Sequence, residues 1–221
     1  MSAMLRVKIC CIASVEEAAL AIRHGAAALG LVGRMPSGPG PIDDSLIAEI
    51  AASAPPAVAT FLLTSETEPE AIVDHVRRCG TNTVQIVDAV EPAAYRALRR
   101  AVPAVKIVQA IHVTGPESLD EAKTLAPLVD ALLLDSGRPQ APVKELGGTG
   151  RVHDWSLSQR IVAEVARPVF LAGGIRPENA AEAYRQVRPF GIDLCTGARR
   201  NGRLDAGRLR GLFAALGLPA P

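Results

Sequence analysis

The most constraining feature of this sequence is an alternation between short apolar runs and longer stretches with helical periodicity. The apolar runs cover residues 5–10, 28–32, 58–63, 83–87, 105–113, 131–134, 168–172 and 192–195. The helical stretches begin near Ser14, Ile42, Glu66, Glu91, Gly115, Trp155, Pro177 and Asp205. Strands that alternate with helices pair in parallel through right-handed crossovers, and eight such units that close on themselves form a (β/α)8 barrel.

We therefore expect an α/β protein with a single (β/α)8 barrel domain over residues 1–221. The competing architecture is an open doubly wound sheet, but no G-x-G-x-x-G signature follows the first apolar run. Two helix starts carry recognisable signals. Ser14 and Glu17 have the spacing of a capping box, and Pro177 with Glu178 is typical of a first helical turn.

Composition excludes several other classes of protein. Lys and Arg number 24 against 23 Asp and Glu, so the chain lacks the basic excess of a nucleic-acid-binding protein. No apolar run approaches the ~18 residues that a membrane span needs. The four cysteines form no C-x-x-C pair and are too few for a disulfide scaffold, which predicts reduced thiols in a cytoplasmic protein.

Active sites of such barrels lie at the C-terminal ends of the strands, where two reactive residues stand out. Cys10 ends the first run and could act as a base or nucleophile, or be a small buried apolar residue. Asp135 follows three leucines and could serve as a general acid, or only cap the next loop. The residues alone leave both choices open.

Three glycine clusters lie at or after the last three predicted strands. They are Gly147-Gly148-Thr149-Gly150, Gly173-Gly174 and the Gly197 that follows Cys195-Thr196. Glycines let backbone N–H groups approach an anion closely, and barrels often hold a phosphate after strands seven and eight. Together the clusters predict a phosphate site.

Histidine and arginine are less informative. His24 and His75 lie in predicted helices and read as solvated or structural, while no H-x-x-x-H or His/Asp/Glu cluster has metal-binding spacing. We therefore expect neither metal nor organic cofactor. The arginine-rich segment from Arg199 to Arg203 reads as a solvated loop, which lies near the mouth because it follows the eighth strand.

The ordered set of motifs resembles the phosphoribosylanthranilate isomerase family of tryptophan biosynthesis over almost the whole chain. Lys8-Ile9-Cys10-Cys11-Ile12 is similar to the family's K-I-C-G-I-T, and Leu133-Leu134-Asp135 to its L-L-D. The family's G-G-T-G…D-W is matched by Gly147-Gly148-Thr149-Gly150 with Asp154-Trp155. Its L-A-G-G-[LI]-x-P-x-N is matched by Leu171-Ala172-Gly173-Gly174-Ile175 with Pro177-Glu178-Asn179. Its G-V-D-V resembles Gly191-Ile192-Asp193-Leu194.

The resemblance implies an aldose–ketose isomerase, formally an intramolecular oxidoreductase, that performs an Amadori rearrangement by acid/base catalysis. It implies Cys10 as the base and Asp135 as the acid. The residues expected to bind substrate or phosphate are Lys8, Gly148, Gly150, Gly173, Gly174, Asp193, Gly197, Arg34 and Arg199. The partner is a small sugar phosphate, neither nucleic acid nor membrane, and the protein is a monomer or a homodimer. A related histidine-pathway isomerase uses an Asp on strand one, so Cys10 favours the tryptophan branch.

Several positions depart from the family pattern. Gly40 stands where the family's P-x-S-P-R-x-[VI] has an arginine that helps hold the anthranilate carboxylate, and Arg34 is a candidate substitute. Val87 replaces a histidine, Arg199 replaces a glutamate, and Cys11 replaces a glycine. Two alternatives follow. The chain could isomerise another phosphosugar amine, or be a phosphosugar-binding barrel without turnover.

Overall fold

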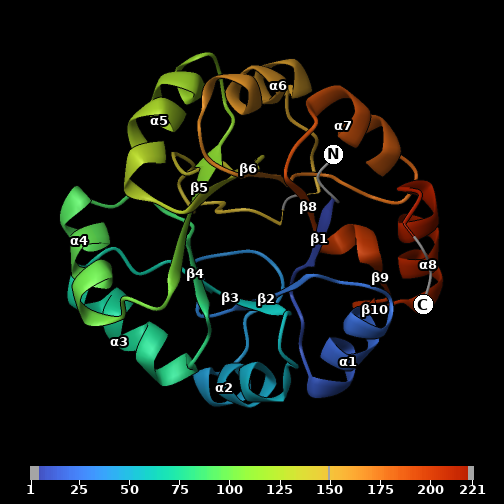
Figure 1. Ribbon diagram of the computed structural model, residues 1–221, viewed down its shortest axis with the longest axis horizontal. Coiled ribbons are helices and arrows are strands. Elements are labelled where there is room, and N and C mark those ends of the chain that lie inside the picture. The colour runs from blue at the N-terminus through green and yellow to red at the C-terminus, as the bar shows by residue number, and fades with distance from the viewer. Residues whose placement is uncertain (1–4, 149, 219–221) are drawn as a thin grey trace.

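The computed structural model describes residues 5–148 and 150–218 and contains a closed barrel of parallel strands, β1 to β8 in chain order (Figure 1). The strands are β1 (Arg6–Ile9), β2 (Ala28–Val32), β3 (Ala59–Thr64), β4 (Thr83–Ile86), β5 (Lys106–His112), β6 (Ala131–Asp135), β7 (Val169–Leu171) and β8 (Gly191–Leu194). Pairing of β1 with β8, from Arg6 opposite Gly191 to Ile9 opposite Leu194, closes the barrel. The predicted barrel is confirmed and the open sheet is excluded.

Helices surround the barrel as an outer ring (Figure 1). They are α1 (Val15–Arg23), α2 (Asp44–Ser53), α3 (Pro69–Cys79), α4 (Pro92–Ala101), α5 (Glu117–Leu125), α6 (Trp155–Glu164), α7 (Ala180–Val187) and α8 (Ala206–Ala215). Two 3-10 turns, η1 (Ala126–Leu128) and η2 (Thr196–Ala198), follow α5 and β8. Each helix lies between consecutive strands or after the last, as the alternation predicts.

Local capping explains where some helices begin. Ser14 caps α1, because its hydroxyl accepts a hydrogen bond from the Glu17 amide at 3.2 Å. The reciprocal half of the predicted capping box is absent, since the Glu17 carboxylate accepts from the Ala13 amide instead. At α6 the cap is Asp154, whose carboxylate accepts from the Ser156 amide at 2.8 Å.

The seventh helix begins later than the sequence predicts. Pro177 and Glu178 lie in a turn before α7, which starts at Ala180. The side chain of Asn179 accepts a hydrogen bond from the Arg176 amide and donates one to the Gly174 carbonyl. These bonds hold the turn open from Gly174 to Asn179, so the residues after β7 stay at the mouth of the barrel instead of entering the helix.

The core has two layers that follow from the alternation of side chains along each strand. On β6, Leu132 and Leu134 pack outward against the helices, whereas Leu133 points into the barrel. Inside the barrel, the rings of Phe61 and Phe170 meet edge to face with centroids 5.8 Å apart. Both faces of each strand are therefore buried, which explains why the strands read as near-continuous apolar runs.

The segment after β8 is more ordered than the solvated loop that the sequence predicts. It forms a small antiparallel hairpin of β9 (Arg199–Arg200) and β10 (Arg203–Leu204). Figure 1 shows the hairpin beside α1, on the side of the barrel where β8 and β1 meet. No helix in the described part of the chain is long and apolar enough to cross a membrane.

Candidate active site

A hollow that is open to solvent lies over the C-terminal ends of the strands. Cys10 and Asp135 both line it, from the ends of β1 and β6. Gly148, Gly150, Gly173, Gly174 and Asp193 line it as well. The structure therefore brings together most of the side chains and glycines that the sequence singles out for the site.

Cys10 sits at the floor of this hollow above a buried ion pair. The Lys8 ammonium, fully buried, contacts the Asp193 carboxylate at 2.9 Å. Burial raises the pKa of Cys10 to about 11, while the charge of Lys8 acts in the opposite direction and favours the thiolate. Room for the thiol comes from Gly30 on β2, where a Cβ would lie 2.6 Å from the Cys10 sulfur.

Lys8 and Asp193 form a buried ion pair inside the barrel. Burial alone would lower the pKa of Lys8, but the charges of Asp193 and Cys10 outweigh it and raise that pKa. Burial also raises the pKa of Asp193, which Lys8 opposes. Lys8 lies beneath the hollow and does not line it. This position suits a residue that supports the Cys10 thiolate better than one that contacts the substrate directly, as the sequence predicts.

Asp135 is half-buried at the end of β6 and faces the loop that carries the first glycine cluster. One of its oxygens accepts a hydrogen bond from the Ser136 amide at 2.7 Å. The other points at Gly147, where a Cβ would lie 2.5 Å from Oδ2. A glycine at position 147, with φ of 124°, is thus what lets the loop close over the carboxylate.

The glycine clusters form one side of the hollow. Gly148, Gly150, Gly173 and Gly174 all have positive φ, the left-handed conformation that glycine adopts without steric cost. Thr149, in the first cluster, lies outside the described residues. Gly197 packs against Ile175, because an added Cβ would lie 2.1 Å from the Ile175 carbonyl oxygen. Gly197 does not line the hollow.

The two arginines proposed to meet the substrate lie away from the hollow. Arg34 is exposed and Arg199 belongs to a neighbouring recess with Gly40 and Thr196. The Arg199 guanidinium donates to the Glu17 carboxylate at 2.7 Å and to the Cys11 carbonyl. Arg199 thereby fastens the hairpin after β8 to the start of α1.

A disulfide joins the same two segments. Cys11, directly after Cys10, is bonded to Cys195, with 5.6 Å between their Cα atoms. The expectation of four reduced cysteines is therefore wrong for this pair, because parallel pairing of β1 with β8 brings together thiols separated by 184 residues. Cys10 and Cys79 are free and buried.

Cys11 also explains the glycine found at position 40. A Cβ at Gly40 would lie 2.7 Å from the Cys11 Cβ, and Gly40 has φ of 90°. A side chain at position 40 of this backbone would therefore meet Cys11, so these two departures from the family pattern lie in contact at the mouth.

Several residues of the hollow escape analysis by sequence, among them Ser37, Gln85 and Thr196. Gln85 lies on β4 and lines the hollow, and its buried side-chain carbonyl oxygen has no hydrogen-bond partner among the described residues. Alternation along β4 would have placed it inside the barrel. His153 contacts the Ser158 hydroxyl through Nε2 at 2.7 Å and does not line the hollow.

The fold and the hollow define the class of protein: a (β/α)8 barrel with its reactive groups gathered at the C-terminal ends of the strands, the arrangement of barrel enzymes. The family model described as N-(5'-phosphoribosyl)anthranilate (PRA) isomerase matches residues 7–215. The chain therefore belongs to the PRA isomerase family, whose members catalyse an isomerisation in tryptophan biosynthesis.

Individual relatives agree with this assignment. An N-(5'-phosphoribosyl)anthranilate isomerase 2 from Methanosarcina mazei is 39% identical over 203 residues, which is 91% of this chain and 89% of that protein. The isomerase of Thermosynechococcus vestitus is 34% identical and covers 99% of this chain and 92% of its own length.

Solved structures are similar over nearly their whole length. The phosphoribosyl anthranilate isomerase of Thermus thermophilus has a TM-score of 0.81 at 30% identity, over 96% of this chain and 98% of that one. A family structure in complex with reduced 1-(o-carboxyphenylamino)-1-deoxyribulose 5-phosphate has a TM-score of 0.78 at 26% identity, covering 97% of this chain and 99% of that one.

Proposed function

We propose that this chain converts N-(5'-phosphoribosyl)anthranilate into 1-(o-carboxyphenylamino)-1-deoxyribulose 5-phosphate by acid/base catalysis, with Asp135 as the acid and Cys10 as the base. The observation that carries the proposal is that both residues line one hollow beside the glycine-rich cradle. The reaction needs no external oxidant or reductant, because it moves hydrogen within one substrate, as an intramolecular oxidoreductase does.

The first step is opening of the furanose ring. Asp135 donates a proton to the ring oxygen, the C1–O bond breaks towards that oxygen, and the nitrogen lone pair forms a protonated Schiff base at C1. The half-buried position of Asp135 at the edge of the hollow suits a group that must both reach the substrate and recover its proton from solvent.

The second step removes the proton from C2. Cys10, as thiolate, takes this proton, the C2–H electrons form a C1–C2 double bond, and the C=N electrons return to nitrogen. The enolamine then becomes the ketone by losing its hydroxyl proton and gaining one at C1. A cationic Schiff base beside Cys10 favours the thiolate, adding to the charge of Lys8 against the cost of burial.

We expect the phosphate to bind at the glycine-rich side of the hollow. Backbone N–H groups around Gly148, Gly150, Gly173 and Gly174 would donate to its oxygens, without a metal ion. Anchoring the phosphate there places the sugar between Asp135 and Cys10. Positioning of this kind converts binding energy into correct orientation of the reacting atoms.

A second candidate function is isomerisation of another phosphosugar amine. It is favoured by one observation: the arginine of the family pattern is replaced by Gly40, where a Cβ would meet Cys11, and this changes the groups offered to the anthranilate carboxylate. A phosphosugar-binding barrel without turnover is disfavoured, because binding alone requires neither Cys10 nor Asp135.

The experiment is product identification by NMR and mass spectrometry after incubation of purified protein with phosphoribosylanthranilate. Formation of the aminodeoxyribulose phosphate supports the proposal. In parallel, the phosphoribosyl derivatives of aniline and of small aliphatic amines test the second candidate. Turnover of those compounds but not of the anthranilate derivative would overturn the assignment of substrate, and inorganic phosphate binding without any turnover would support the non-catalytic barrel.

A further inference from the structure

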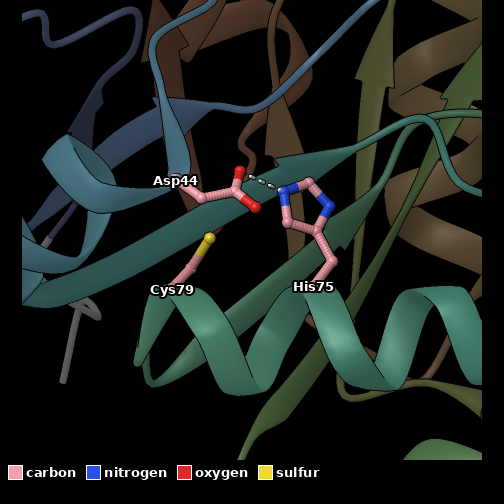
Figure 2. Close-up of side chains that lie close together, drawn as sticks. All are labelled: Asp44, His75 and Cys79. Carbon is pink, nitrogen blue, oxygen red and sulfur yellow. Dashed lines mark hydrogen bonds and ion pairs between the residues drawn. The ribbon is translucent and has the colours of Figure 1, made fainter.

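A second cluster of reactive side chains lies outside the active site, where α2 packs beside α3. Asp44, His75 and Cys79 converge there, with one ligand atom from each lying within 4.8 Å of the others (Figure 2). Among the described residues, 5–148 and 150–218, this is the only such group of three or more His, Cys, Asp and Glu side chains. None of the three lines the active-site hollow.

The local structure fixes all three side chains on rigid elements. His75 and Cys79 are four residues apart on α3, so they share one face of that helix, and Asp44 is the first residue of α2. His75 and Cys79 are buried, while Asp44 is partly exposed. Asp44 thus connects the cluster to solvent and gives an ion a route of entry.

Hydrogen bonds orient the imidazole for ligation. His75 Nδ1 lies 2.9 Å from the Thr64 hydroxyl at the end of β3, and Nε2 faces Asp44 Oδ1 at 3.1 Å. A hydroxyl can donate or accept, so Thr64 can accept a hydrogen bond from Nδ1–H when Nε2 binds a cation. Metal-binding histidines are commonly held through their other ring nitrogen in this way.

Charge is also compatible with a divalent cation. Arg78 donates to Asp44 Oδ2 at 2.9 Å, on the oxygen that does not face His75. Oδ1 thus remains available as a ligand while Arg78 continues to orient the carboxylate. A thiolate at Cys79 and a carboxylate at Asp44 would together neutralise a doubly charged ion, so the loaded site would carry no net charge from these groups.

We propose that Asp44, His75 and Cys79 form a binding site for zinc, or another borderline-soft divalent cation, that links α2 to α3. Sulfur, nitrogen and oxygen donors in one site suit Zn²⁺ and Co²⁺, whereas Mg²⁺ and Ca²⁺ prefer oxygen alone. Water completes the tetrahedral set. On binding, the Cys79 thiol gives its proton to solvent and its sulfur bonds the metal, with no change in oxidation state.

The role that the geometry assigns to this site is structural. His75 packs against Gly33, where a Cβ would lie 2.5 Å from the imidazole Cε1. Gly33 begins the loop that reaches the hollow through Ser37. A cation bound at the cluster would therefore anchor both ends of the segment between β2 and α2, without contacting the substrate.

The test is titration of the purified full-length protein with Co²⁺, followed by visible and near-ultraviolet absorption. We expect a sulfur-to-cobalt charge-transfer band and tetrahedral d–d bands, both displaced by Zn²⁺. Cys79→Ala should abolish the charge-transfer band, and Cys10→Ala, which removes the other free buried thiol, should retain it. Thr64→Val should weaken Co²⁺ binding by ~10- to 100-fold.

Two results would overturn the proposal: absence of the charge-transfer band in the wild-type protein, or its persistence in Cys79→Ala. Should Cys79→Ala fail to fold, Asp44→Asn provides the second variant, with weaker Co²⁺ binding as the expected result and unchanged binding as the contradicting one. Thermal unfolding with and without Zn²⁺ gives an independent readout, because a cation that binds the folded state raises Tm.

Discussion

The two free cysteines are the same residue in similar burial, but the neighbouring charge with the larger effect has the opposite sign at each of them. Burial raises the pKa of Cys10 to about 11 and that of Cys79 to about 12. Beside Cys10 lies the ammonium of Lys8, which favours the thiolate, whereas beside Cys79 lies the carboxylate of Asp44, which opposes it. Burial alone therefore does not decide what a thiol can do.

The difference between these regions lies in which neighbouring charge acts more strongly on the thiol. At the barrel mouth the charge of Lys8, held by Asp193 at 2.9 Å, lowers the pKa of Cys10 more than the charge of Asp193 raises it. At the α2–α3 seam the charge of Asp44 raises the pKa of Cys79 more than the charge of Arg78 lowers it. The first arrangement suits a base that must repeatedly lose and regain a proton, and the second suits a metal ligand.

The largest expected effect separates these two cysteines by turnover. Removal of the proposed base in Cys10→Ala should lower kcat/KM by about 10²- to 10⁴-fold, the usual contribution of general acid–base catalysis. Cys79→Ala should lower it less than ~10-fold, because its thiol lies outside the site of proton transfer. The rates of both variants are measured from the loss of phosphoribosylanthranilate fluorescence as the substrate is consumed. Equal losses in the two variants would contradict the distinction.

The disulfide should contribute strongly to stability. Cys11 and Cys195 are separated by 184 residues, and closing so long a loop removes entropy from the unfolded chain worth up to about 5 kcal/mol in the chain-entropy account. Reductant should therefore lower the free energy of unfolding in urea by up to that amount. Cys195→Ala, as the control, should show no response to reductant. A wild-type protein equally insensitive to reductant would refute a stabilising disulfide.

Removal of the buried lysine should destabilise the fold by a comparable amount. Lys8→Met leaves Asp193 buried without its partner, which typically costs about 3–5 kcal/mol. The double variant Lys8→Met/Asp193→Leu removes both charges and should recover much of that loss. Urea unfolding of the three proteins checks this. If the double variant is no more stable than Lys8→Met, loss of packing, not the unpaired charge, explains the effect.

The smallest effect concerns the coupled positions at the mouth. Gly40→Arg alone should cost about 1–3 kcal/mol of stability through crowding of Cys11, and more if the positive φ strains the backbone. Gly40→Arg combined with Cys11→Gly should relieve the crowding, although it also removes the disulfide. Cys11→Gly alone supplies the reference. Non-additivity between Gly40→Arg and Cys11→Gly, read from unfolding curves, would demonstrate the coupling, and simple additivity would disprove it.

Strand positions could be predicted from sequence because the barrel buries both faces of each strand. Residues 28–32 are predicted and observed as a strand without any shift, and the other runs agree within two residues at either end. The start of α7 could not be predicted in this way. Pro177 is compatible with a first helical turn, but hydrogen bonds of Asn179 to Arg176 and Gly174 hold a turn there instead.

The site was predictable where the signal is local and hidden where it depends on distant partners. Cys10, Asp135 and the glycines around 148 and 173 follow strands, so their place at the mouth follows from the fold. Arg199 reads as a free cation in sequence, but Glu17, 182 residues away, binds it. Pairing of Cys11 with Cys195 is equally invisible to spacing.

The cluster of Asp44, His75 and Cys79 illustrates the same limit. The H-x-x-x-C spacing of His75 and Cys79 is legible along α3, whereas Asp44 lies 31 residues before His75 and joins them only because α2 packs beside α3. Two ligands alone do not predict a site. The tertiary contact between neighbouring helices supplies the third.

In the proposed mechanism Cys10 is the catalytic base and Lys8 supports its thiolate. The pH dependence of kcat/KM tests it most directly, measured for wild type, Cys79→Ala and Lys8→Gln. Since the pKa of Cys10 is raised to about 11 in the free enzyme, kcat/KM should keep rising above pH 9 in wild type and Cys79→Ala. Lys8→Gln should move this limb to still higher pH. A limb that levels off near pH 8.5, or that Lys8→Gln leaves in place, would contradict the account.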